Sequence, residues 1–233
     1  MRILVIIPAR GGSKGIPHKN IKPFCGKPLI EYSIDTARHI VSDEDICVST
    51  DDAEIIKCVE DYGLKVPFVR PAELATDTAG TYEVLLHALS FYENHGRKYD
   101  CILLLQTTSP FRTVLHVENA LAMYSPDLDM VVSVKECATN PYYNCFEEDE
   151  CGYLKQTIDS ACLVRRQDAP VTYEYNGAVY VINPNSLRKM PMGMFAKRKK
   201  YLMDTLHSVD LDSVMDWKFA EYLVQIVDIK IGL

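Results

Sequence analysis

Short apolar runs alternate along this chain with longer segments in which apolar residues recur at helical spacing. The run ILVII (3–7) is rich in β-branched side chains, and CILLLQ (101–106) is similarly apolar. Such runs are typical of strands buried on both faces of a parallel sheet. Further strands are expected at 45–50, 66–69, 130–134 and 178–182, with another ending in SVDLD (208–212). Helices are expected at 28–40, 51–63, 80–96, 114–124 and 214–227.

This alternation predicts an α/β protein with a doubly wound, mainly parallel sheet. The length fits one large domain, so we expect a single domain over residues 1–233. The rhythm breaks near residue 137, at the start of a polar, tyrosine-rich stretch with the acidic cluster EEDE (147–150). We expect residues 137–176 to form an excursion that carries a hairpin and packs against a second copy in a homodimer.

A cationic, glycine-rich loop, PARGGSKGIPHKN, follows the first predicted strand. The protein has a net charge of −7, yet its first 30 residues hold six basic and no acidic residues. Ligands of doubly wound sheets bind beyond the carboxyl ends of strands, where this loop lies. Glycine-rich backbone can turn N–H groups toward an anion, and Arg and Lys add charge. The loop therefore predicts a triphosphate site, with a solvated basic turn as the alternative. It matches neither the Walker loop nor the G-x-G-x-x-G fingerprint.

The acidic balance of the remaining residues argues against nucleic-acid and membrane partners. No apolar run is long enough to span a membrane, and the N-terminal run is too short for a signal peptide. The eight cysteines form no C-x-x-C pair, which favours reduced thiols in a cytoplasmic protein. The six histidines show no metal-binding spacing along the sequence, and we expect most of them on the surface.

Five motifs resemble, in order, those of the acylneuraminate cytidylyltransferases, the CMP-sialic acid synthetases. They are IPARGGSKGIPHKNI, RPAELATDTA, LLLQTTSPFR, YNGAVYV and SVDLD, and they extend from residue 3 to residue 212. The resemblance implies a Rossmann-like nucleotidyltransferase fold. It also implies transfer of CMP from CTP to the anomeric hydroxyl of N-acetylneuraminate or a related nonulosonic acid, with release of pyrophosphate. The alternatives are the same chemistry on legionaminic, pseudaminic or deaminated neuraminic acid or Kdo, or a catalytically inactive nucleotide-binding module.

The resemblance assigns the phosphates to the cationic loop. It implies that Arg10 and Lys14 hold the β- and γ-phosphates and that Lys19 lies near the α-phosphate, so these three are the candidate catalytic residues. The candidate nucleotide-binding residues are Arg10, Gly11, Gly12, Ser13, Asn20, Arg70, Ala79 and Thr81. Arg70 would hydrogen-bond the carbonyl oxygen of the base. In the same motif, Thr76 or Asp77 could instead simply cap the following helix.

For the sugar acid, the resemblance implies contacts from the motifs LLLQTTSPFR and YNGAVYV and from the excursion at 137–176. The candidates are Gln106, Thr108, Ser109, Arg166, Asn176, Gly177 and Tyr180. Arg166 would pair with the sugar carboxylate across a subunit boundary, or else be a surface arginine. Gly177 would allow close approach of the sugar or mark an edge-strand bulge. Thr107 stands where the family usually has proline, which leaves the exact sugar open. Tyr143 stands where some members have lysine, which leaves open how the acid is held.

SVDLD supplies the candidate metal ligands. In an extended segment Asp210 and Asp212 point to one face, and two adjacent carboxylates repel unless a cation lies between them. Mg²⁺ prefers a few carboxylates together with phosphate oxygens. The resemblance implies that this pair binds Mg²⁺ (or Mn²⁺) at the triphosphate, and an exposed strand end is the alternative.

Overall fold

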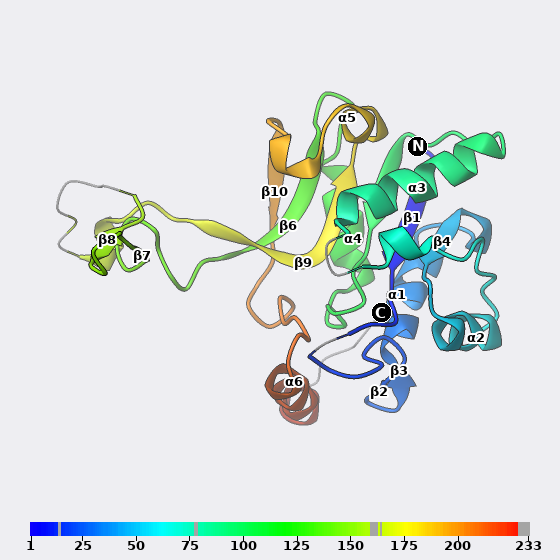
Figure 1. Cartoon of the computed structure of the whole chain (residues 1–233), viewed down its shortest axis with the longest axis horizontal. Coiled ribbons are helices and arrows are strands. Elements are labelled where there is room, and N and C mark those ends of the chain that lie inside the picture. The colour runs from blue at the N-terminus through cyan, green and yellow to red at the C-terminus, as the bar shows by residue number, and fades with distance from the viewer. Residues whose placement is uncertain (14, 77–78, 159–162, 164, 228–233) are drawn as a thin grey trace.

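A six-stranded sheet forms the centre of the protein (Figure 1). The computed structural model describes residues 1–13, 15–76, 79–158, 163 and 165–227. The strand order is β10-β6-β9-β5-β1-β4, and β9 is antiparallel to both of its neighbours while the other pairs are parallel. The strands are β1 (Ile3–Pro8), β4 (Ile46–Ser49), β5 (Cys101–Leu104), β6 (Met130–Glu136), β9 (Tyr173–Ile182) and β10 (Arg198–Leu202).

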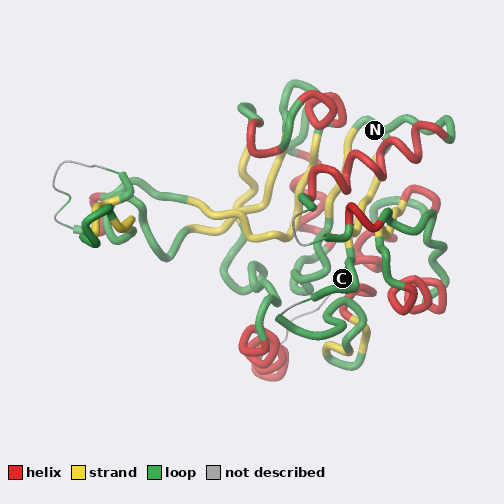
Figure 2. The backbone as a smooth tube through the Cα atoms, in the orientation of Figure 1, coloured by secondary structure: helices red, strands yellow, loops and turns green. Residues whose placement is uncertain are grey.

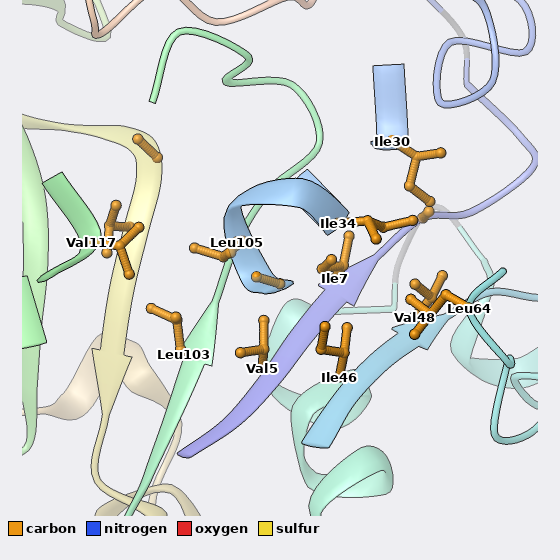
Figure 3. Close-up of a cluster of buried hydrophobic side chains, with 14 of the residues drawn as sticks. Val5, Ile7, Ile30, Ile34, Ile46, Val48, Leu64, Leu103, Leu105 and Val117 are labelled. Carbon is orange, nitrogen blue, oxygen red and sulfur yellow. The ribbon is translucent and has the colours of Figure 1, made fainter. Parts of the chain in front are cut away.

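Helices cover both faces of the sheet, which confirms the doubly wound prediction. They are α1 (Leu29–Arg38), α2 (Ala53–Asp61), α3 (Thr81–Asn94), α4 (Val114–Ala122), α5 (Pro184–Lys189) and α6 (Val214–Ile226). Side chains alternate along a strand, so Val5 and Ile7 of β1 pack with α1, α2 and α4 (Figure 3). Leu4 and Ile6 pack on the other face with α3 and α5. The helix α6 packs its Trp217 instead on Phe24, beside the first loop.

The segment 66–69 is not a strand, contrary to the sequence prediction. Only an isolated bridge pairs Val69 with Thr50. Pro67 lies inside this segment and has no N–H to donate to a ladder, so the apolar side chains alone do not make it a strand.

The prediction that a strand ends within 208–212 is also wrong. The last strand, β10, ends at Leu202, and the chain then turns through residues 205–208. The N–H of Leu211 donates to the carbonyl oxygen of Thr108, 2.9 Å away, rather than to a neighbouring strand. The acidic motif therefore lies on a loop, residues 203–213, that crosses the carboxyl end of β5.

Residues between β6 and β9 leave the sheet as a long arm (Figures 1 and 2). At its far end β7 (Phe146–Glu148) pairs antiparallel with β8 (Leu154–Gln156), so the expected hairpin is present. A second small ribbon pairs β2 (Pro23–Phe24) with β3 (Lys27–Pro28). Among the described residues no helix is long and apolar enough to cross a membrane.

Candidate active site

A cavity of about 480 Å³ opens at the carboxyl ends of β1 and β5. Its lining brings together candidates from four motifs that are far apart in sequence: Arg10, Ser13, Lys19, Asn20, Arg70, Ala79, Thr81, Gln106, Thr108 and Asp212. Thr107, Pro8 and Val84 also line it. The sheet therefore gathers the cationic loop, the RPAEL motif, the QTTSP motif and one acid of SVDLD around one pocket, as the rule for strand ends predicts. Lys14, the remaining candidate cation, lies outside the described residues.

The glycines of the loop allow close packing rather than unusual backbone angles. A Cβ on Gly11 would lie 2.1 Å from Oδ2 of Asp52, and one on Gly15 would lie 2.2 Å from the carbonyl oxygen of Asp212. Gly12 faces open space. The positive φ in this loop belongs to His18, at 51°. Gly11 and Gly15 thus let the loop approach the start of α2 and the acidic loop.

Lys19 and Asp212 form an ion pair at the mouth of the pocket. The Lys19 Nζ lies 3.0 Å from Oδ1 of Asp212. The lysine side chain is only 13% exposed, whereas that of Asp212 is 73% exposed. The cation is therefore held in place by the protein, and the carboxylate can reach a soluble ligand.

Asn20 is fixed by two hydrogen bonds, one partly buried and one buried. Its Nδ2 donates to the carbonyl oxygen of Arg10 at 3.0 Å, and its Oδ1 accepts from Oγ1 of Thr107 at 2.6 Å. Asn20 and Thr107 are both buried. Thr107 was not among the candidate site residues, although its departure from the family's proline was a signal in the sequence. It orients the asparagine against the cationic loop.

Arg70 lies buried beneath the pocket, although it carries a charge. Its Nε donates to Oγ of Ser49 at 3.1 Å, and its Nη2 donates to the carbonyl oxygen of the same residue. Burial lowers the pKa of Arg70, and the nearby carboxylate of Asp51 opposes this effect. The guanidinium is therefore anchored to the end of β4 while it lines the cavity.

Arg112, also outside the candidate list, holds the QTTSP motif to the sheet. Its side chain is 1% exposed, and its Nη1 donates to the carbonyl oxygens of Gln106 at 3.1 Å and Ala178 at 2.9 Å. Its Nη2 donates to Oγ of Ser33 at 2.8 Å. Burial lowers the pKa of Arg112 to about 9. The sequence shows an arginine here, but only the fold shows that it joins β5, β9 and α1.

Gly177 brings β9 close to the QTTSP motif and to Asp210. Its φ is 76°, and a Cβ there would lie 3.1 Å from Oε1 of Gln106 and 3.6 Å from Oγ of Ser109. The register between β6 and β9 shifts at this point, between Val132 and Val134. The structure therefore shows the bulge at this glycine and a close approach of its backbone to Gln106 and Ser109.

Asp210 is half-buried next to this bulge. Burial raises the pKa of its carboxyl group, a hydrogen bond from Thr108 lowers it, and the nearby charge of Asp212 raises it. Its Oδ1 is buried and has no hydrogen-bond partner among the described residues. An unpaired buried carboxylate oxygen costs free energy unless a cation or donor meets it. Together with the exposed carboxylate of Asp212, this oxygen fits a divalent cation.

Five of the seven candidates for sugar binding are not among the residues that line the main cavity: Ser109, Arg166, Asn176, Gly177 and Tyr180. Arg166 is on the arm, where its Nη2 donates to the carbonyl oxygen of Ala138 at 2.9 Å. Asn176 is buried. Its Oδ1 accepts a hydrogen bond from Oγ of Ser133 at 2.6 Å, and its Nδ2 donates one to Oγ of Ser208 at 2.9 Å. Tyr180 lines a smaller adjoining cavity of about 180 Å³, which shares Thr81 and Gln106 with the main one.

The fold and this pocket define a nucleotidyltransferase-type α/β protein. The structure resembles CMP:2-keto-3-deoxy-manno-octonic acid synthetase complexed with CTP, with a TM-score of 0.70 and 17% identity over 97% of this chain and 99% of the other. It also resembles 4-diphosphocytidyl-2C-methyl-D-erythritol synthase of Anaerococcus prevotii, with a TM-score of 0.62 and 18% identity over 96% and 98% of the two chains. These likenesses show the fold.

The chain belongs to the cytidylyltransferase family, whose model matches residues 4–229. It is 32% identical to CMP-N,N'-diacetyllegionaminic acid synthase of Legionella pneumophila over 97% of both chains. It is 35% identical to N-acylneuraminate cytidylyltransferase of Streptococcus agalactiae over 93% of this chain, which spans about half (52%) of that relative. It is 29% identical to pseudaminic acid cytidylyltransferase of Campylobacter jejuni over 97% of both chains.

Proposed function

We propose that this protein transfers CMP from CTP to the anomeric hydroxyl of a nonulosonic acid and releases pyrophosphate. One observation carries the proposal: a single cavity joins the cationic loop, the buried Arg70 and the Lys19–Asp212 pair. Three relatives that cover most of this chain are named for legionaminic, N-acylneuraminic and pseudaminic acids. Among these sugar acids we propose N-acetylneuraminate as the first substrate to test.

The chemistry needs no nucleophile from the protein, because the sugar hydroxyl attacks the α-phosphorus of CTP. Catalysis then depends on positioning and on stabilising charge. Arg10 and Lys14 would hold the β- and γ-phosphates, and Lys19 would lie near the α-phosphate, where charge develops. Arg70 would meet the base. Gln106, Thr108 and Ser109 would face the sugar from the end of β5.

Asp210 and Asp212 would hold Mg²⁺ (or Mn²⁺). When bound, the ion would neutralise negative charge on the triphosphate. The buried, unpartnered Oδ1 of Asp210 supports this assignment. Asp212 would exchange its present partner, Lys19, for the ion, which would release the lysine to the α-phosphate. The ion pair thus keeps both groups close to where each would act.

We further propose a homodimer in the cytoplasm, in which the arm of one subunit reaches the site of the other. The position of Arg166 supports this, because it lies on the arm and not among the residues that line the cavity of its own chain. A partner's arm would add a cation for the sugar carboxylate.

The test is pyrophosphate release from CTP and Mg²⁺ with a panel of nonulosonic acids, against a control lacking the sugar. Release that depends on N-acetylneuraminate supports the full proposal. Release with legionaminic or pseudaminic acid alone keeps the reaction and corrects the sugar. CTP binding without release for any sugar acid would contradict the proposal and favour a binding-only module.

A further inference from the structure

Two histidines and an aspartate meet on the surface at the edge of the sheet. His116 is in the first turn of α4, and Asp204 and His207 lie in the turn after β10. One potential ligand atom from each residue lies within 4.8 Å of the others. The two imidazole rings are 4.7 Å apart between centroids, and Nδ1 of His207 lies 2.7 Å from Oδ2 of Asp204. No local pattern in the sequence predicts this cluster, because 91 positions separate the two histidines.

We propose that His116, Asp204 and His207 bind Zn²⁺. Two imidazoles and one carboxylate are a common set of protein ligands for zinc, with water completing a tetrahedron. Mg²⁺ prefers oxygen ligands and would not compete well here. The cluster is distinct from the pair Asp210 and Asp212, whose ligand atoms are all oxygens. Among the described residues, no other group of three His, Cys, Asp or Glu side chains brings its ligand atoms within 4.8 Å of one another.

The ligands are already oriented by hydrogen bonds within the protein. Nδ1 of His116 lies 3.0 Å from Oγ1 of Thr113, the residue that caps α4. The backbone N–H of Thr113 donates to the same Nδ1 at 3.2 Å, so Nδ1 is occupied as an acceptor and Nε2 is the nitrogen left to bind a metal, in exchange for its proton. Such second partners fix the ring orientation of metal-binding histidines. Asp204 is held similarly, because its Oδ1 accepts the backbone N–H of His207 at 2.9 Å.

The cluster is open enough to load from solvent and sheltered enough to order its ligands. The side chain of Asp204 is 59% exposed and that of His207 is 25% exposed. His116 is half-buried. A bound cation would lie beside the existing contact between His207 and Asp204. Metal binding here therefore needs no change of fold.

A cation at this position would clamp the loop 203–213 to the start of α4. The carbonyl oxygen of Asp204 accepts from Oγ of Ser208 at 2.6 Å, and that hydroxyl accepts from Nδ2 of Asn176 at 2.9 Å. Three residues further along, the N–H of Leu211 binds the carbonyl oxygen of Thr108. The zinc site would thus steady one end of the loop that carries Asp210 and Asp212, with a structural rather than a chemical role.

The test is calorimetric titration of Zn²⁺ into the full-length, metal-stripped protein with Mg²⁺ in large excess to occupy any oxygen site. We expect one Zn²⁺ per chain. His207→Ala should lose this binding, and Asp204→Asn should weaken it at least tenfold. His39→Ala, at an exposed histidine at the end of α1, is the matched control and should bind as the wild type does. Equal binding by His207→Ala and the wild type would overturn the proposal.

Cobalt substitution identifies the ligands independently. Co²⁺ in the proposed site should give visible bands of a tetrahedral nitrogen and oxygen environment. Intense near-ultraviolet thiolate bands would show binding by one of the cysteines and would overturn the proposal. Asp210→Asn should leave the cobalt spectrum unchanged, because that carboxylate belongs to the other site. Far-ultraviolet circular dichroism checks that each variant is folded. If His207→Ala does not fold, the milder Asp204→Asn still tests the proposal.

Discussion

At the scale of single residues, the polar side chains that shape the pocket are mostly buried and the acid at its mouth is exposed. Arg70, Thr107 and Arg112 are each at most 5% exposed and hold backbone or side-chain partners. Leaving a buried polar group unpaired costs about 1–3 kcal/mol. Changes at these positions should therefore alter stability and binding together, whereas a change at Asp212 should alter function alone.

Asp212→Ala should abolish turnover and leave the fold intact. The lost carboxylate would otherwise hold the cation at the triphosphate, and removing such electrostatic stabilisation typically costs about a hundredfold to a thousandfold in rate. The carboxylate of Asp212 is 73% exposed, so its ion pair with Lys19 contributes about 0–1 kcal/mol and the thermal midpoint should hardly change. Pyrophosphate release and differential scanning fluorimetry measure the two effects. A variant with wild-type rates in Mg²⁺ would refute the metal assignment.

Thr107→Val should weaken both stability and CTP binding. Valine keeps the volume but removes the hydroxyl that donates to Oδ1 of Asn20, so a buried acceptor loses its partner. We expect a loss of about 1–3 kcal/mol in the free energy of unfolding and a higher KM for CTP. Thr107→Ser keeps the hydroxyl and is the control. If both variants behave alike in denaturation and kinetics, the hydroxyl does not hold the asparagine.

At the scale of elements, the local pattern of apolar residues predicts the buried strands but not the contacts between residues far apart in the sequence. The strands β1 and β5 follow from continuous apolar runs. β10 was missed because its sequence, RKKYL, is charged, which suits the edge of a sheet. The site loops were predicted because they follow buried strands. The buried network of Asn176 and the meeting of His116 with His207 depend on contacts across many residues, which no local pattern contains.

One such distant contact is the carboxylate of Asp129, which ties β6 to the segment before β10. It accepts from Oγ of Ser186 and from the N–H groups of Ala196 and Lys197. The hydrogen bonds from Ser186 and then Lys197 lower its pKa below the ordinary 3.8. A carboxyl group with a lowered folded-state pKa stabilises the protein above the unfolded-state value, and this contribution is lost as the pH falls through the folded-state value.

Asp129→Asn should therefore lower the free energy of unfolding by about 1–2 kcal/mol at neutral pH, because an amide cannot accept all of these donors. The difference from the wild type should shrink as the pH falls below the ordinary 3.8 and through the lowered folded-state pKa, where the native aspartate becomes protonated. Urea denaturation across this range measures it. Asp127→Asn, at a neighbouring exposed position, is the control and should track the wild type. A difference that does not change with pH would contradict the role of the charge.

At the scale of the whole molecule, the arm is the feature that a single chain does not explain. Its hairpin stands far from the sheet (Figure 1) and exposes Phe146, Tyr153 and Leu154. Tyr153 and Leu154 are more than 70% exposed. Exposed apolar side chains gathered on one projection are typical of a contact surface. This supports the proposed homodimer.

Leu154→Glu should convert the proposed homodimer to monomers and reduce turnover, because a charge at the contact must be buried without a partner. Light scattering gives the mass, and pyrophosphate release gives the activity. Leu115→Glu, at an equally apolar and 62% exposed position on α4, should remain dimeric. A wild-type protein that is monomeric and fully active would refute the shared site.

The strand β9 determines where insertions and deletions can be tolerated in this chain. It runs unbroken from the arm at Tyr173 to the centre of the sheet at Ile182. Insertions or deletions within 137–172 would leave the register of β9 in the sheet unchanged. A single-residue deletion between Gly177 and Ile182 would instead exchange the two faces of the strand and point its apolar side chains the wrong way. Inherited length changes should therefore accumulate before Tyr173 and stop there, which makes the arm the part of the molecule most free to acquire a new partner.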